Sequence, residues 1–121
     1  MKKLFIIILA AILTYTSAFP AYASEESIGR CRITFYCNCA RCCGRAGQRT
    51  ASGTWPERYR TIAAGPSIPF GTRIRIDGFE DIRVVEDRGV SDNCIDVFVP
   101  DHEECLRLGM FYRECFIVKG E

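Results

Sequence analysis

Two aspartates stand close together in this sequence, each at the end of an apolar run or inside one. Asp87 ends the run 84–87, and Asp96 lies inside the run 94–99. A carboxylate is costly to bury without a partner, so an acid in such surroundings is generally paired or used. The turn-like link 88–93 joins the two runs. The pattern suggests a pair of carboxyl groups that does acid–base work on a sugar bond.

The two aspartates are expected to have different surroundings. A strand over 94–99 puts Asp96 on the face opposite to its aliphatic side chains, next to Phe98. Shielding by that ring would raise the carboxyl pKa and favour the protonated acid that glycosidic cleavage needs. An exposed surface aspartate paired with an arginine is the open alternative. Asp87 precedes the turn at Arg88-Gly89, where it could bind substrate or orient its neighbour, or simply initiate the turn.

The first 23 residues have the pattern of a secretory signal peptide. Lys2 and Lys3 precede an apolar stretch over 4–13, and Ala21-Tyr22-Ala23 offers small residues for cleavage. The stretch is shorter than the about 20 residues of a membrane span, although an uncleaved anchor stays open. Cleavage after Ala23 would remove both lysines and no acid, which moves the formal net charge from +1 to −1.

This charge balance bears on the partners of the chain. Neither sign dominates, so nothing indicates nucleic acid or an anionic membrane as a partner. We expect a monomer that has no stable membrane insertion once the signal is removed.

All eight cysteines lie beyond residue 23, and an even count in a small exported domain predicts disulfides, in a pairing that the sequence does not give. Cys39 and Cys42 also have the Cys-x-x-Cys spacing that suits zinc ligation. The sequence shows no matching second pair of ligands, so disulfides are favoured, no cofactor is expected, and zinc is the open alternative. The disulfide or metal candidates are Cys31, Cys37, Cys39, Cys42, Cys43, Cys94, Cys105 and Cys115.

His102 is the only histidine. Its place beside Asp101, at the start of a predicted helix, indicates a surface residue rather than a catalytic one. A thiol–histidine nucleophile is therefore not expected, because exported cysteines serve better as crosslinks.

Strand patterns dominate the remaining chain. Strands are predicted over 31–37, 61–64, 72–76, 81–87, 94–99 and 113–119. A tight turn at Asp77-Gly78 would make the third and fourth of these a hairpin. Residues 24–30 are expected to form a flexible lead-in and 41–59 a long loop pinned by the cysteines.

One helix is predicted over 101–108. Asp101 can cap it, Glu104 can reach back to the cap, and Gly109 can end it. Short strands with one late helix predict an all-β domain over 31–121, either a small closed barrel or a β-sandwich.

Several motifs follow one another at consistent distances: Thr50-Ala51-Ser52-Gly53-Thr54, the run 61–72 around Gly65-Pro66, Glu86-Asp87-Arg88-Gly89 and Ile95-Asp96-Val97-Phe98. Their order resembles the 3D domain family, which is named for three aspartates. That family includes the C-terminal part of membrane-bound lytic transglycosylase A and bacterial stationary-phase survival proteins. The resemblance covers about 33–118, and the Tyr-Cys-x-Cys-x-x-Cys-Cys-Gly stretch at 36–44 is similar to a branch from Gram-positive bacteria.

The resemblance implies a six-stranded double-psi β-barrel and an exported or wall-associated bacterial lytic transglycosylase that acts in cell-wall turnover. Such an enzyme cleaves the β-1,4 bond between N-acetylmuramic acid and N-acetylglucosamine in peptidoglycan strands and leaves a 1,6-anhydro sugar. Asp96 matches the family's acid/base, and Asp87 matches a second carboxylate that steadies positive charge on the ring. Tyr36, Thr50 and Ser52 are expected to contact the sugar.

One family aspartate is missing, because Gly65 stands at the position of the first. Asp77 or Glu86 are candidates to compensate for it in space. The loss favours an alternative of a different class, a non-catalytic peptidoglycan-binding or structural wall module. A metal-dependent module organised by the cysteines is a third hypothesis.

Overall fold

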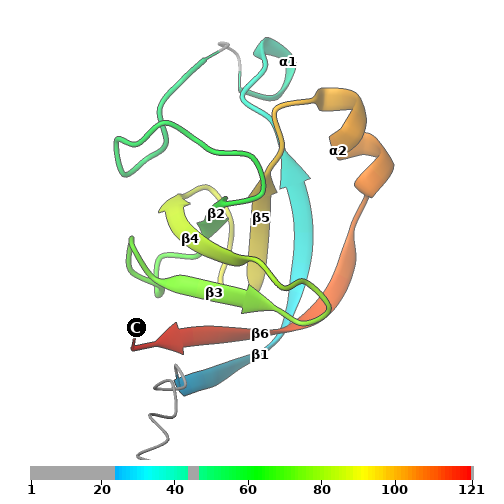
Figure 1. Cartoon of the computed structure of the whole chain (residues 1–121). Coiled ribbons are helices and arrows are strands. Elements are labelled where there is room, and N and C mark those ends of the chain that lie inside the picture. Colours follow the sequence, from blue (N-terminus) through cyan, green and yellow to red (C-terminus); the bar gives the residue numbers. More distant parts are fainter. Residues whose placement is uncertain (1–23, 44–46, 121) are drawn as a thin grey trace, which may run out of the picture.

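Six strands close into a barrel in the computed structural model, which describes residues 24–43 and 47–120. The predicted signal peptide lies outside these residues. Figure 1 shows the barrel with two short helices at one end. The strands are β1 (Ser24–Tyr36), β2 (Thr61–Ala64), β3 (Arg73–Ile76), β4 (Ile82–Asp87), β5 (Cys94–Phe98) and β6 (Phe111–Lys119), and the helices are α1 (Ala40–Cys43) and α2 (His102–Leu108).

The barrel is mixed, with the strand order β1-β5-β2-β4-β3-β6. β1 with β5 and β2 with β4 are parallel pairs, while the other neighbours are antiparallel. The prediction of a small closed six-stranded all-β barrel is therefore confirmed over the β-sandwich. The two parallel pairs are compatible with the double-psi arrangement that the family resemblance implies.

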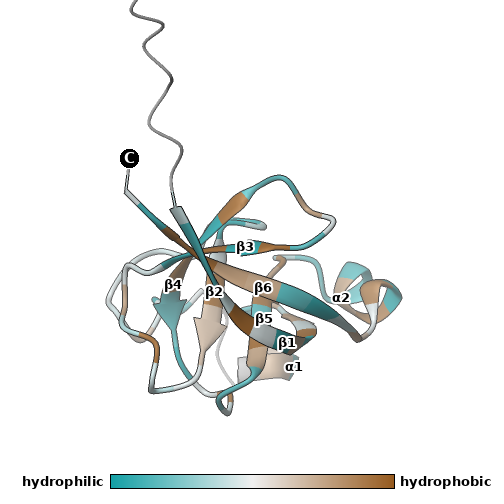
Figure 2. Ribbon diagram, turned by 90° about the horizontal axis from the view of Figure 1, so that it is seen from below, coloured by the Kyte–Doolittle hydropathy of each residue, from teal (hydrophilic) through white to brown (hydrophobic). Residues whose placement is uncertain are grey.

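Alternating side chains make the core. In β3, Ile74 and Ile76 are fully buried while the arginines between and before them are half-buried on the outside. β5 follows the same rule with Ile95 and Val97. Figure 2 shows brown, apolar segments alternating with teal ones along several strands. A core face thus alternates with an outer face in these strands, and in β5 the outer-face residues Cys94 and Phe98 are covered as well, so that only Asp96 is half-buried there.

The start of the described chain differs from the predicted flexible lead-in. Residues 24–30 belong to β1 and pair with β6, with an irregularity between Ser27 and Gly29. Glu25 accepts two hydrogen bonds from the Arg75 guanidinium at 2.7 and 2.8 Å. The polar composition of this stretch does not indicate a strand. The strand forms because β6 and Arg75, which lie far along the chain, supply its pairing partner and its ion pair.

The helices differ from the prediction in two details. α1 is a single turn inside what was expected to be loop. α2 is capped as predicted by Asp101, whose side chain accepts from the amides of Glu103 and Glu104, and Gly109 ends it. The expected return bond from Glu104 to the cap is wrong, since its carboxylate instead binds Arg58 and the Tyr59 hydroxyl. α2 is therefore tied to the segment before β2. Among the described helices, none is long and apolar enough to cross a membrane.

Truncation of a core residue tests this architecture. Ile95 is 1% exposed, so Ile95→Ala is expected to cost roughly 2–5 kcal/mol of unfolding free energy through lost burial and a cavity. Leu106 on α2 is 64% exposed and is the matched control, with Leu106→Ala expected to change stability by about 0.5 kcal/mol or less. Urea unfolding followed by circular dichroism measures both, and equal midpoints for the two variants would contradict the assigned core.

Candidate active site

Asp96 lies on the outer face of the barrel, as the alternation in β5 predicted. Its neighbours Ile95 and Val97 belong to the core, while Asp96 itself is half-buried. On β1, Thr34 stands directly opposite Asp96 and donates a 2.8 Å hydrogen bond from Oγ1 to Oδ1. On the other side, Ala63 of β2 is the paired residue. Asp96 is therefore flanked by one hydroxyl and one methyl group.

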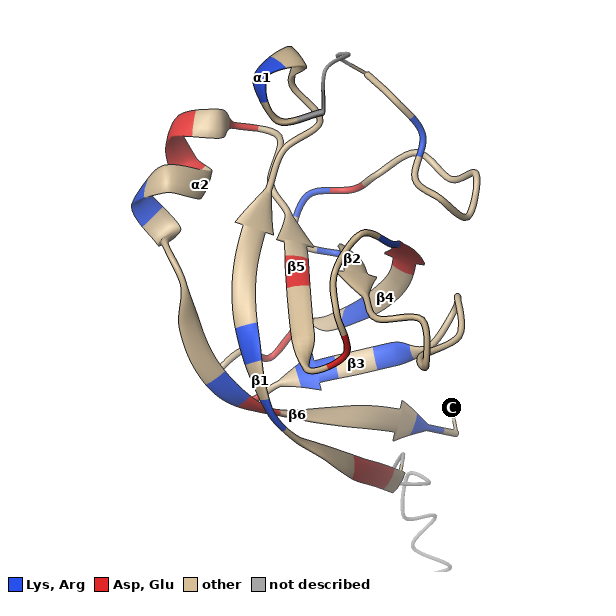
Figure 3. Cartoon of the chain, turned by 180° about the vertical axis from the view of Figure 1, so that it is seen from behind, with Lys and Arg blue, Asp and Glu red and all other residues tan. Residues whose placement is uncertain are grey.

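A bulge brings Asp87 to the same place. Ile62 pairs with Val85, but the next residue of β2, Ala63, pairs with Asp87, so that Glu86 is skipped. Bulges of this kind redirect side chains, and here the bulge turns Asp87 to the outer face in place of Glu86. Asp87 and Asp96 thus lie on either side of Ala63, with Cα atoms roughly 10 Å apart across two strand spacings. Figure 3 shows the acidic segments of β5 and of the end of β4 on either side of β2.

Three donors hold the Asp87 carboxylate. Tyr36 donates from its hydroxyl at 2.8 Å, and the backbone amides of Ala51 and Arg88 donate at 3.0 and 2.9 Å. The Tyr36 ring packs edge-on against Phe98, with the ring centroids 5.5 Å apart. Asp87 is therefore fixed in orientation by a strand, a turn and a loop that are distant from one another in the sequence.

The electrostatics of Asp96 match its predicted shielding. Burial raises the pKa of the Asp96 carboxyl, the Thr34 hydrogen bond lowers it, and the nearby Asp87 charge raises it again. Arg32 lowers this pKa by a smaller contribution, so the net direction is upward. A raised pKa extends the pH range over which Asp96 can hold a proton for transfer.

A hollow of about 240 Å³ opens beside Asp87. Its wall includes Tyr36, Asn38, Gln48, Thr50, Asp87 and Arg88. Two of the predicted sugar contacts, Tyr36 and Thr50, thus line one hollow with Asp87. Ser52 lies on the exposed turn next to it, where its amide donates to the Glu86 carbonyl at 3.0 Å. Asp96 lies outside this wall, on the same outer face of the barrel.

The Thr50 hydroxyl also has a local role. It bonds to the hydroxyls of Thr54 at 2.7 Å and Ser52 at 3.1 Å, which closes the turn 50–54. This turn presents the Ala51 amide to Asp87. Thr50 is therefore a positioning residue of Asp87 as well as part of the wall.

Sequence reasoning missed the cationic and aromatic groups around this hollow. Arg49 lines it and stacks over Trp55, with 4.7 Å from the guanidinium carbon to the ring centroid, and Trp55 is 58% exposed. Arg88 donates to the carbonyl of Ile68 at 2.7 Å and stacks over Phe70 at 4.1 Å. An exposed tryptophan next to a polar hollow is a common signal for a binding surface, and it was available in the sequence.

Gly65 has no room for a side chain. A Cβ built there would lie 2.1 Å from Oδ1 of Asp92, which Ser67 holds by donating from its hydroxyl at 2.7 Å. The Asp92 carboxylate therefore occupies the space into which an aspartate at position 65 would project.

The other two acids that were considered as compensation point elsewhere. Glu86 is buried, accepts from the Thr61 hydroxyl at 3.0 Å and pairs with Arg60 at 3.5 Å. Asp77 lies in the connection between β3 and β4, across the barrel from β5.

The cysteines with described side chains occupy four places in the structure. Cys31 and Cys115 are buried together in the core in hydrogen-bond contact, and Cys94 lies 3.8 Å from the Thr34 hydroxyl. Cys105 on α2 donates to the Val99 carbonyl. The remaining described thiols are Cys37, Cys39 and Cys42, which converge on one point, while the side chain of Cys43 lies outside the described residues.

No disulfide joins two of the seven cysteines whose side chains are described, so the predicted framework is not confirmed. His102 also differs from its predicted surface role, because its ring nitrogen Nδ1 lies 3.2 Å from the Cys42 sulfur. The helix start that suggested an exposed side chain instead turns it toward the cysteines.

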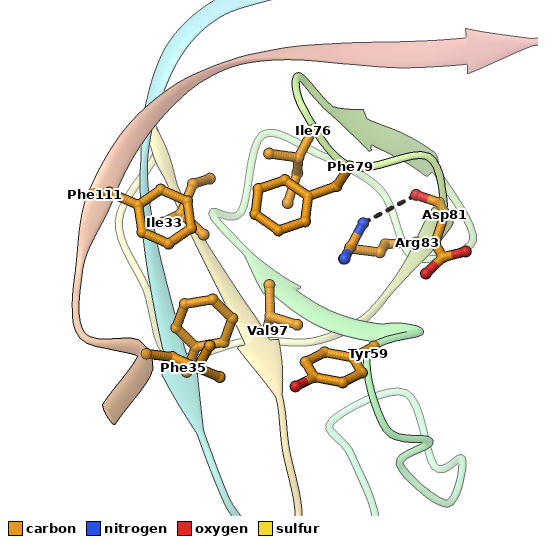
Figure 4. A pocket seen from close by; sticks show the side chains of 10 residues that line it. Ile33, Phe35, Tyr59, Ile76, Phe79, Asp81, Arg83, Val97 and Phe111 are labelled. Atoms are coloured by element: carbon orange, nitrogen blue, oxygen red, sulfur yellow. Dashed lines mark hydrogen bonds between the residues drawn. The ribbon is translucent and has the colours of Figure 1, made fainter. Parts of the chain in front are cut away.

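A second hollow, of about 200 Å³, opens into the barrel core (Figure 4). Its wall is mainly apolar and includes Phe35, Phe79 and Phe111. Arg83 is the cation there, donating to the Asp81 carbonyl at 2.9 Å, and its Nε is buried without a hydrogen-bond partner. Neither Asp87 nor Asp96 lines this hollow, whereas Asp87 lines the polar one.

Neither the models of known protein families nor the curated proteins contain a match to this chain.

Removal of the Thr34 hydroxyl tests the electrostatics of Asp96. Thr34→Val keeps the shape and burial of the residue but removes the hydrogen bond that lowers the pKa of Asp96. The pKa of Asp96 is expected to rise further, as measured by NMR titration of its side-chain carboxyl carbon. Thr34→Ser retains the hydroxyl and is expected to leave the pKa near the wild-type value. An unchanged or lower pKa in Thr34→Val would overturn the assignment.

Asp96 is also expected to reduce the stability of the fold. Because its pKa is raised on folding, the folded state holds the proton more tightly, and stability falls as pH rises from the usual aspartate range through the raised pKa. Asp96→Asn avoids this loss and is expected to be more stable than wild type at neutral pH. The difference should shrink below the usual aspartate range. Urea midpoints measured against pH provide the test, and a variant less stable at every pH would argue against it.

Proposed function

We propose that this protein is an exported bacterial lytic transglycosylase that cleaves the MurNAc–GlcNAc β-1,4 bond of peptidoglycan in cell-wall turnover. The observation that carries the proposal is the placement of Asp96 and Asp87 on one outer face, on either side of Ala63. The family resemblance of the sequence supports the same reaction. The substrate strand would lie along this face and over the hollow next to Asp87.

The reaction needs no water and no cofactor. Asp96 would give its proton to the leaving oxygen as the bond from C1 to that oxygen breaks. The Asp96 carboxylate would then take the proton from the 6-hydroxyl as its oxygen bonds to C1, which forms the 1,6-anhydro ring. The raised pKa of Asp96 supports the first step, because the acid must start protonated.

Asp87 would act as the helper. Its three hydrogen bonds fix the carboxylate in orientation, so it can face the positive charge that develops on the sugar ring. We further infer that Asp92 stands in for the missing first aspartate of the family, because its carboxylate fills the space beside Gly65. Exposed Trp55 and the cation of Arg49 would supply binding surface at the edge of the hollow.

A non-catalytic peptidoglycan-binding wall module is the second candidate. Gly65 favours it, since the lost aspartate marks a departure from the family pattern. The binding surface around Trp55 would serve either function, so only product formation separates the two.

Digestion of purified peptidoglycan is the decisive experiment. Wild type is expected to release muropeptides with 1,6-anhydro ends, detected by mass spectrometry. Asp96→Asn is expected to lower the rate by roughly 10²–10⁴-fold, which is the contribution typical of a general acid/base. Asp77→Asn is the control, because Asp77 is an exposed aspartate across the barrel, and it should retain the wild-type rate.

Two outcomes would overturn the proposal. Products with reducing ends would indicate hydrolysis instead. Retained binding to peptidoglycan with no product from wild type would favour the wall module.

A further inference from the structure

Four side chains with metal-binding atoms converge at the end of the barrel that carries both helices. Cys37 directly follows β1, Cys39 and Cys42 lie at α1, and His102 begins α2. Figure 1 and Figure 3 both show α1 and α2 beyond the ends of β1 and β5. The ligand atoms of these residues all lie within 4.8 Å of one another.

The distances between the ligand atoms of Cys37, Cys39, Cys42 and His102, here called the Cys3His cluster, are short enough for all four to bind one metal ion. The Cys37 sulfur lies 3.0 Å from that of Cys39 and 3.1 Å from that of Cys42. Nδ1 of His102 lies 3.2 Å from Cys42 and 3.7 Å from both Cys37 and Cys39. A tetrahedral zinc ion with Zn–S of about 2.3 Å and Zn–N of about 2.0 Å would separate its ligand atoms by roughly 3.5–3.8 Å. Each of these five distances is therefore within about 1 Å of the tetrahedral value.

A disulfide does not account for this arrangement. It joins two sulfurs at about 2.05 Å and needs no third partner. Here Cys37 is almost equally close to two other sulfurs, and an imidazole nitrogen approaches all three. Three thiols with one imidazole form a complete ligand set for tetrahedral zinc.

The surroundings support ligation as well. Cys39 and Cys42 have Cys-x-x-Cys spacing, and the backbone amide of Cys42 donates to the Cys39 carbonyl at 3.2 Å, which holds the two residues in one turn. Hydrogen bonds around a metal site orient its ligands. Cys37 is fully buried, and the Asp101 cap fixes the first turn of α2, where His102 lies.

We propose that Cys37, Cys39, Cys42 and His102 bind one zinc ion in a closed structural site. The protein supplies all four ligands, so no position is left for substrate or water, as is typical of structural zinc. Binding releases the three thiol protons and leaves His102 neutral, with Nδ1 on the metal. This proposal is independent of the proposed function, because it uses none of the residues assigned to cleavage.

The site would position the loop that borders the hollow. Cys37 follows Tyr36, which donates to Asp87, and Asn38 lies between two of the ligands and lines the hollow. The Asn38 carbonyl accepts a hydrogen bond from the Gly47 amide at 3.1 Å, which ties Gly47 to the segment that carries the ligands. Zinc would thus tie α1, α2 and the end of β1 together.

Metal analysis of the whole chain, produced with zinc in the medium and purified without chelator, tests the proposal. One zinc per chain is expected by elemental mass spectrometry, and removal by a chelator should lower the melting temperature until zinc is restored. Cobalt substitution should give the thiolate-to-metal and visible bands typical of tetrahedral sites. Iron in place of zinc, a substoichiometric trace, or a metal-free protein with Cys37 in a disulfide would each overturn it.

Variants identify the ligands. His102→Ala and Cys42→Ser are expected to weaken zinc binding by roughly tenfold or more, measured by competition with a chromogenic chelator. Glu103→Ala is the matched control, because Glu103 is the exposed neighbour of His102 on α2, and it should bind as wild type does. Cys43→Ser and Cys105→Ser should also retain zinc, and loss of zinc in either would overturn this ligand set.

Discussion

The short strand β2 is the element on which the outer face depends. It lies between β4 and β5, all four of its residues are buried, and its Ala63 is paired with Asp87 on one side and Asp96 on the other. Ala63, which is itself buried, lies between the two acids in the strand pairing. The hydrogen bonds of two ladders with different directions hold this spacing, so the relative position of the carboxyl groups is a property of the barrel backbone rather than of flexible loops.

The two aspartates have different surroundings in the barrel. Asp96 lies in the middle of a strand and accepts one hydrogen bond, from a hydroxyl. Asp87 ends its strand and accepts three hydrogen bonds. The more desolvated Asp96 is thus suited to exchanging a proton, and Asp87, with its three hydrogen bonds, is suited to keeping a fixed orientation. The core beneath them, which includes Ile62, Val85 and Ile95, supplies the stability that this arrangement requires.

Local patterns in the sequence were sufficient for the central strands and for the face of Asp96, but not for the first residues of β1. Alternation over 72–76 reports directly which side chains are buried, whereas over 94–99 it reports only the face of Asp96, because every other residue of that run is buried. The bulge at Glu86 could not be predicted, since it exists only in the register between β2 and β4. The approach of His102 to Cys42 was also hidden, because 60 residues separate them and their contact depends on where β1 and β5 end.

The pairing of β1 with β6 joins the first and last described segments of the chain. These strands cannot meet until β6 has been synthesised, so the barrel stays open until its other strands are complete. Contacts between such distant segments also form slowly, because a long loop must be closed first. The topology therefore delays completion of the core until the last strand of the barrel is present.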